Sequence, residues 1–168
     1  MRRLMLCSLL VLPLCAVAAD RGPDGSFYRH AAEGGIAEVQ LGNLALKKSQ
    51  DPAIRDFAAQ MLKDQSEAND KLRSVAAAEN VRLPHKASVA EMGTKARLEV
   101  LSGETFDKAY VKAMMKDHEK DLAEFRREAR YGQDPQAKAF ASETLPTLKE
   151  HLARIRSIAD KSGLTASR

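Results

Sequence analysis

Two stretches of this chain begin with the same two residues, and they constrain its fold more than any other feature. The pairs are Asp51-Pro52 and Asp134-Pro135. Aspartate caps a helix N-terminus and proline fits its first turn, so each pair predicts the start of a helix. Behind each pair, apolar or small residues recur at intervals of three and four, the period of a helix packed on one face. These positions are Ile54, Ala58, Met61, Ala68, Leu72 and Val75 in the first stretch, and Ala137, Ala141, Thr144, Leu148, Ile155 and Ile158 in the second.

The rest of the sequence has helical periodicity and no alternating strand pattern. The expected helices span residues 26–48, 52–79, 88–101, 105–131 and 135–161. We therefore predict an all-α fold: a ferritin-like four-helix bundle made of two helical hairpins, with a short extra helix in the middle connection. That long connection permits the second and third long helices to run parallel.

The first nineteen residues have the features of a secretory signal peptide. Two arginines, Arg2 and Arg3, precede an apolar run over residues 4–12, and Ala16-Val17-Ala18 supplies the small residues that a signal peptidase needs. We expect cleavage near Ala18 or Ala19. The expected location is the periplasm or cell envelope of a bacterium.

After the signal peptide, we expect a disordered leader over 20–25, a single bundle domain over 26–161 and a frayed tail over 162–168. Both cysteines, Cys7 and Cys15, lie inside the signal peptide. The mature chain would then contain no thiol, which excludes disulfides, thiol catalysis and cysteine-ligated metals.

Charge patterning bears on possible partners. The full chain has a formal net charge of +4, and its charged residues alternate in sign, as in residues 116–121. This pattern is typical of a solvated helix rather than of a basic stripe, so we expect no nucleic-acid partner. Beyond the signal peptide, no stretch approaches the length of a transmembrane helix. The sequence indicates neither a particular protein or envelope partner nor an oligomeric state.

Four polar residues interrupt the apolar helix faces near mid-helix: Glu38, Gln65, His118 and His151. Counted from the turn of each hairpin, the two residues of a hairpin lie at nearly the same height, because a helix rises about 1.5 Å per residue. They could therefore form one polar layer inside the bundle. Such a layer is satisfied either by hydrogen bonds among its members or by one divalent transition-metal ion of the Zn²⁺ or Fe²⁺ type.

The sequence does not favour an enzyme. Di-iron bundles carry Glu-x-x-His on two helices, but Met115 and Leu148 stand three residues before His118 and His151. Nucleotide-binding loops, zinc-protease motifs and Ser/His/Asp sets are also missing from the sequence. We therefore propose no catalytic residue and no organic cofactor.

Four segments resemble a secreted bacterial family known as domain of unknown function 4142. They are residues 32–39, 106–110, 116–118 and 145–152. The resemblance implies a ferritin-like bundle without an established activity. It also implies a layer of one glutamate and three histidines, which favours metal binding, and Gln65 stands where the third histidine is expected.

Two functions follow as alternatives. The first is an exported, non-enzymatic binding protein or an envelope or stress-related protein. The second is a bundle that binds one transition-metal ion through Glu38, Gln65, His118 and His151.

Overall fold

The structure, a computed structural model, describes residues 24–163, and within them the chain forms helices and no strand. The all-helical prediction is therefore confirmed for this part of the chain. The expected signal peptide, residues 20–23 of the leader and residues 164–168 of the tail lie outside the described residues. The helices are α1 (Gly25–Lys48), α2 (Pro52–Ala78), α3 (Val89–Glu99), α4 (Gly103–Tyr131) and α5 (Pro135–Lys161).

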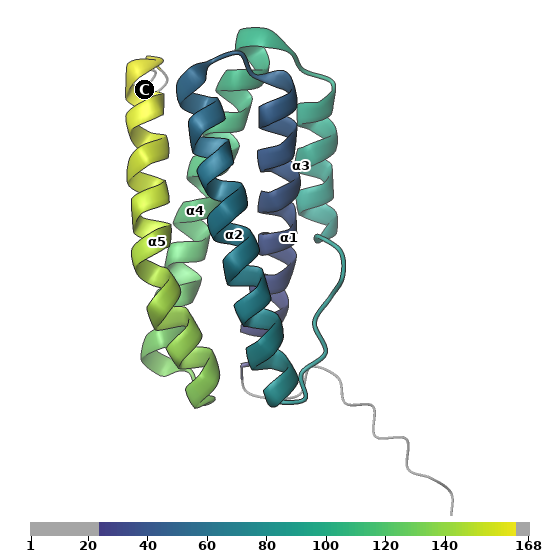
Figure 1. Cartoon of the computed structure of the whole chain (residues 1–168), viewed down its shortest axis with the longest axis vertical. Helices are drawn as coiled ribbons and strands as arrows, with labels where there is room; N and C mark the ends of the chain where they lie inside the picture. Colours follow the sequence, from purple (N-terminus) through teal and green to yellow (C-terminus); the bar gives the residue numbers. More distant parts are fainter. Residues whose placement is uncertain (1–23, 164–168) are drawn as a thin grey trace, which may run out of the picture.

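The four long helices pack as two hairpins side by side. Helix α1 packs on α2 and α4 packs on α5, while the hairpins meet through α2 against α5 and α1 against α4. Figure 1 shows that α1 and α5 point one way along the bundle and that α2 and α4 point the other way. The short α3 lies outside this group, against α1 and α4.

The repeated Asp-Pro pairs start helices as predicted. The Asp51 carboxylate accepts hydrogen bonds from the backbone N–H groups of Ala53 and Ile54, and that of Asp134 accepts one from Gln136. These bonds satisfy N–H groups that have no partner within the helix itself. The observed helices begin and end within two residues of the predicted positions.

One continuous apolar core runs through the bundle. Phe57 and Phe140, which occupy equivalent places in the two hairpins, both belong to it, as predicted. At one end Phe27 packs edge-on against Phe125, with 5.0 Å between ring centroids. On α1, Gly35 lets Asn69 of α2 approach so closely that a Cβ atom would collide with its side-chain amide.

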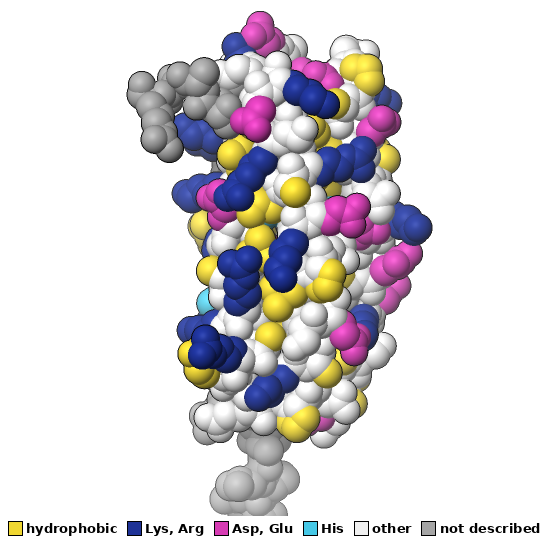
Figure 2. Space-filling view, turned by 90° about the vertical axis from the view of Figure 1, so that its left-hand side faces the viewer, with side chains coloured by type: hydrophobic (Ala, Val, Ile, Leu, Met, Phe, Trp, Pro, Cys, Tyr) yellow, Lys and Arg dark blue, Asp and Glu magenta, His cyan; other side chains and the backbone are white. Residues whose placement is uncertain are grey.

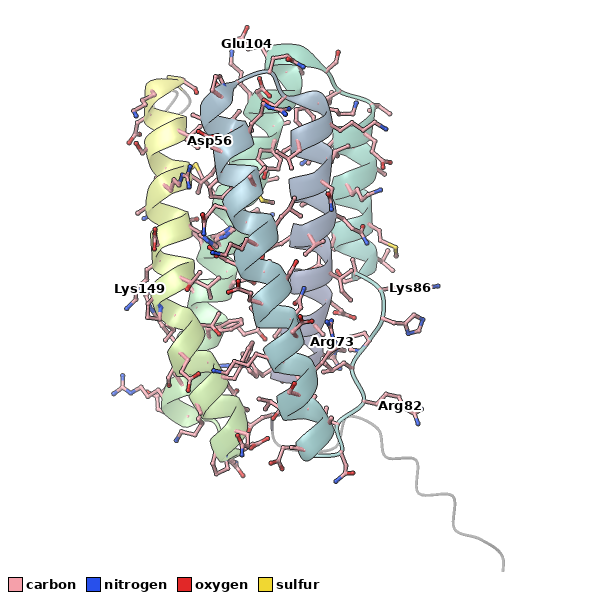
Figure 3. All side chains as sticks on the ribbon, viewed as in Figure 1. Asp56, Arg73, Arg82, Lys86, Glu104 and Lys149 are labelled. Atoms are coloured by element: carbon pink, nitrogen blue, oxygen red, sulfur yellow. The ribbon has the colours of Figure 1, made fainter. Side chains whose placement is uncertain are left out.

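Charged side chains cover the outside of the bundle. Arg82, Lys86 and Lys149 project away from the helices in Figure 3. The side of the molecule that carries α5 shows both charge signs interspersed with apolar side chains (Figure 2). No helix in the described part of the chain is long and apolar enough to cross a membrane.

A group of acids joins the start of α1 to the turn between α4 and α5. The Asp24 carboxylate accepts hydrogen bonds from the backbone N–H groups of Gln133 and Asp134. The Glu128 side chain is buried close to Asp24. Burial, followed by the negative charge of Asp24, raises the pKa of Glu128 to about 7. Glu128 therefore holds a proton in the folded protein at pH values where an exposed glutamate is ionised.

This raised pKa predicts a pH-dependent stability. The folded-state pKa of Glu128 lies above the unfolded value of about 4.3, so stability is lost as pH rises through about 7. We expect Glu128→Gln, which cannot ionise, to raise the free energy of unfolding by on the order of 1 kcal/mol at pH 8 and to leave it unchanged at pH 4. Urea denaturation at both pH values checks this. The exposed Glu119→Gln on the same helix should show no such pH-dependent gain, and an equal gain in both variants would contradict the argument.

Candidate metal centre

Each long helix contributes one residue of the predicted polar layer. Glu38, His118 and His151 are buried, with 1%, 0% and 2% of their surfaces exposed, and Gln65 is half-buried. Glu38, Gln65 and His118 meet in the middle of the bundle, and the His151 ring lies against that of His118. The matched heights counted from the sequence thus correspond to real proximity.

Gln65 contacts Glu38 through a hydrogen bond. Its side-chain amide donates to Oε2 of Glu38. An amide N–H has no lone pair to offer a metal ion, so in this orientation Gln65 positions the Glu38 carboxylate rather than acting as a ligand. The other carboxylate oxygen, Oε1, is left facing His118.

His118 is held in one tautomer. Its Nδ1 lies 2.9 Å from the carbonyl oxygen of Met114, to which it can only donate. Burial lowers the pKa of His118 to about 4, so the ring is neutral at neutral pH and its Nε2 carries a lone pair. That Nε2 lies 3.5 Å from Oε1 of Glu38, and neither atom has a hydrogen-bond partner within residues 24–163.

His151 is oriented by a residue that the sequence analysis did not single out. Its Nε2 lies 2.8 Å from Oδ2 of Asp64, and the Gln60 amide donates to the same carboxylate. Burial alone would raise the pKa of Asp64, but the bonds from Gln60 and His151 hold it below its usual value. The ionised Asp64 thus accepts the Nε2 proton of His151. The Nδ1 atom is then free to act as a ligand, and it is buried without a partner in the described chain.

The two imidazoles are packed tightly. Their ring centroids lie 5.6 Å apart at an angle of 69°, and each lies 6.2 Å from the ring of the fully buried Phe57. Two imidazole nitrogens and one carboxylate oxygen in this layer are thus buried and lack a hydrogen-bond partner within residues 24–163. In this conformation, the ligand atoms of Glu38, His118 and His151 do not all lie within 4.8 Å of one another, so a shared ion would require His151 to shift. A carboxylate and a backbone carbonyl behind the two imidazoles are the usual supports of metal-binding histidines.

Further carboxylates lie close to Glu38. Oxygens of Glu38, Asp117 and Asp121 lie within 4.8 Å of one another, and Glu91 of α3 is close enough to raise the pKa of all three. Burial, followed by the charges of Asp121 and Asp117, raises the pKa of Glu38 well above its usual value. Burial and the charge of Asp117 raise the pKa of Asp121 to about 8.

These acids correct one prediction. Residues 116–121 have the alternating charges of a solvated helix, but Asp117 and Asp121 are half-buried and face α1. Their spacing of four places them on one side of α4, a signal that the sequence contained. Asp64 had no comparable signal, because its role depends on His151 from another helix.

Residues 12–158 match the family described as domain of unknown function DUF4142. The chain belongs to the DUF4142 family. No curated protein sequence matches this DUF4142 chain.

Solved structures share the fold of this DUF4142 chain. A DUF305 fragment from Deinococcus radiodurans is 14% identical, with a TM-score of 0.71 over 81% of this chain and 94% of that one. A DUF305 protein from Streptomyces coelicolor, described by its name as a candidate secreted protein, is 13% identical, with a TM-score of 0.72 over 86% and 95% of the two chains. At these identities the likeness shows the fold alone.

Proposed function

We propose that this DUF4142 protein is an exported, non-enzymatic helical bundle that binds one divalent transition-metal ion through Glu38, His118 and His151. The observation that carries the proposal is the pair of buried atoms His118 Nε2 and Glu38 Oε1, 3.5 Å apart and each without a donor within residues 24–163. With Nδ1 of His118 donating to Met114, a proton or a cation must lie between them.

The donor set favours a transition metal. Two neutral imidazoles and one carboxylate suit Zn²⁺ or an Fe²⁺-type site with open positions. Ligands about 2.0 Å from a tetrahedral zinc ion lie about 3.3 Å apart, close to the separation of these two atoms. If Glu38 instead donates its own proton to His118, the layer is only hydrogen-bonded, and the experiment below distinguishes the two cases.

The proposal also covers the arrangement of the bundle and the location of the protein. We infer a ferritin-like arrangement, supported by the two antiparallel hairpins and by the parallel course of α2 and α4 on either side of the connection that contains α3. We infer export to the periplasm or cell envelope, supported by the signal-like residues 1–19 and by the name of the Streptomyces structure.

The test uses the chain purified from the periplasm of an expressing host without a metal-affinity column. Its intact mass should correspond to a start at Ala19 or Asp20. After chelation, a Zn²⁺ titration should bind one ion, and free Zn²⁺ at 100 times Kd should stabilise the fold by about 2.7 kcal/mol. The Gln65→His variant should bind Zn²⁺ more tightly, because an imidazole replaces an amide that donates no lone pair.

Matched variants separate metal binding from folding. His118→Leu with His151→Leu should abolish the Zn²⁺-dependent rise in melting temperature. The metal-free stability should fall by on the order of 1 kcal/mol, because Asp64 loses the hydrogen bond from His151. His30→Leu with His85→Leu removes the same number of imidazoles outside the layer and should retain the rise. The proposal is refuted if neither the natural protein nor Gln65→His shifts its melting temperature with Zn²⁺, Fe²⁺ or Cu²⁺ at neutral pH.

A further inference from the structure

The carboxylates on the α3 side of Glu38 form a distinct group. Glu38 comes from α1, while Asp117 and Asp121 lie one turn apart on α4, and their oxygens lie within 4.8 Å of one another. Oxygen ligands lie 2.3–2.6 Å from a calcium-sized ion, so one cation could contact all three carboxylates after at most small side-chain shifts.

The positive charges that act on this group come from exposed side chains. Oε1 of Glu38 is buried and has no hydrogen-bond donor within the described part of the chain. The ammonium of Lys120 lies 4.0 Å from Oε1 of Glu91, and the Lys120 side chain is 55% exposed. Lys116, which is also exposed, acts on Asp117 as Lys120 does, but a divalent cation held directly by the three carboxylates would compensate their charge more fully.

The group is also accessible. A cavity of about 300 Å³, partly open to solvent, lies beneath α3, and Glu91, Asp117 and Lys120 contribute to its wall. Across from it, Gly34 places no side chain against the acids: a Cβ atom there would lie 3.9 Å from Oδ2 of Asp121 and 4.0 Å from Oε1 of Glu91. A small cation could therefore enter from the α3 side without passing through the imidazole layer.

We propose that Glu38, Asp117 and Asp121 form a second, oxygen-only cation site that takes a hard divalent cation such as Mn²⁺ or Ca²⁺. Carboxylate oxygens suit hard cations, whereas imidazoles suit zinc-type ions. This site goes beyond the proposed transition-metal site and shares only Glu38 with it. Glu91 lies at the cavity side and adds negative charge that draws the cation in.

The first experiment titrates the metal-free mature chain with Mn²⁺ and follows the electron paramagnetic resonance signal of free Mn²⁺. We expect one bound Mn²⁺ that Ca²⁺ displaces. Asp117→Asn with Asp121→Asn should weaken Mn²⁺ binding by at least about tenfold, because two of three anionic ligands are lost. The control, Asp56→Asn with Glu67→Gln, removes two exposed carboxylates of α2 and should bind as the natural chain does. Equal binding by both double variants, or no Mn²⁺ binding at millimolar concentration, would overturn the proposal.

The second experiment needs no variant. In nuclear magnetic resonance spectra of the natural chain, sub-stoichiometric Mn²⁺ should broaden the amide signals of residues 34–38, 91 and 117–121 first. Broadening centred on any other region, or none, contradicts the site even where the aspartate variants fold poorly. The His118→Leu with His151→Leu variant separates the two proposals: it should lose Zn²⁺ binding and keep Mn²⁺ binding. If the natural chain binds Zn²⁺ but not Mn²⁺, only the oxygen-only site is refuted. If it binds Mn²⁺ but not Zn²⁺, only the transition-metal site is refuted.

Discussion

Replacing Glu38 with glutamine is expected to stabilise the metal-free protein by about 1–3 kcal/mol at pH 8. Glu38 is buried beside Asp117 and Asp121, and its Oε1 faces the lone pair of His118. A glutamine has the same shape, carries no charge and can donate an N–H to His118 while accepting the hydrogen bond from Gln65. The variant therefore resembles the protonated form of Glu38.

The direction of this stability change follows from the pH dependence of Glu38 ionisation. The pKa of Glu38 is raised in the folded protein, so the natural chain loses stability as pH rises from the unfolded value of about 4.3 through the folded one. The glutamine variant has no such loss, and its advantage should shrink toward zero near pH 4. Urea denaturation at pH 4 and pH 8 measures the difference. A variant less stable than the natural chain at pH 8 would show that the ionised carboxylate is favourable in the fold.

The same substitution should have the opposite effect on metal binding. Glu38 is the ligand common to both proposed sites, so Glu38→Gln should weaken Zn²⁺ and Mn²⁺ together. A gain in metal-free stability combined with a loss of both metals would mean that Glu38 lowers the stability of the empty bundle and contributes to ligand binding. Unchanged binding of either metal would remove Glu38 from that site.

Phe57→Ala is expected to lower the free energy of unfolding by about 3–5 kcal/mol, the usual cost of removing a buried aromatic ring. Phe57 is 0% exposed and packs against the rings of His118 and His151. Its loss would leave a cavity beside the polar layer and free both imidazoles to reorient. Urea denaturation of the metal-free chain measures the effect.

An exposed aromatic provides the control for this substitution. Tyr131 is 67% exposed, so Tyr131→Ala should change the free energy of unfolding by less than about 0.5 kcal/mol. If Phe57→Ala cost less than about 1 kcal/mol, the bundle would have to collapse around the missing ring, which would contradict close packing around Phe57.

The sequence by itself determined the helices and the height of the polar layer. Asp51 and Asp134 cap their own helices through bonds to residues two or three positions ahead, so the signal is local and readable. Apolar spacing identified the buried side of α2 and of α5. The fixed rise per residue then placed Glu38, Gln65, His118 and His151 at one level.

Only the tertiary structure decided which of these atoms meet. Helix periodicity leaves the rotation of one helix against another open by about a residue, and packing such as Gly35 against Asn69 determines it. Because of that rotation, Gln65 donates a hydrogen bond to Glu38, and His151 pairs with Asp64. It also places Asp117 and Asp121 close to Glu38. Each of these pairings joins residues of different helices, and both burial and the pKa shifts that follow from it depend on neighbours distant in sequence. For that reason, the carboxylate group proposed as an oxygen-only site forms only when the helices are packed together.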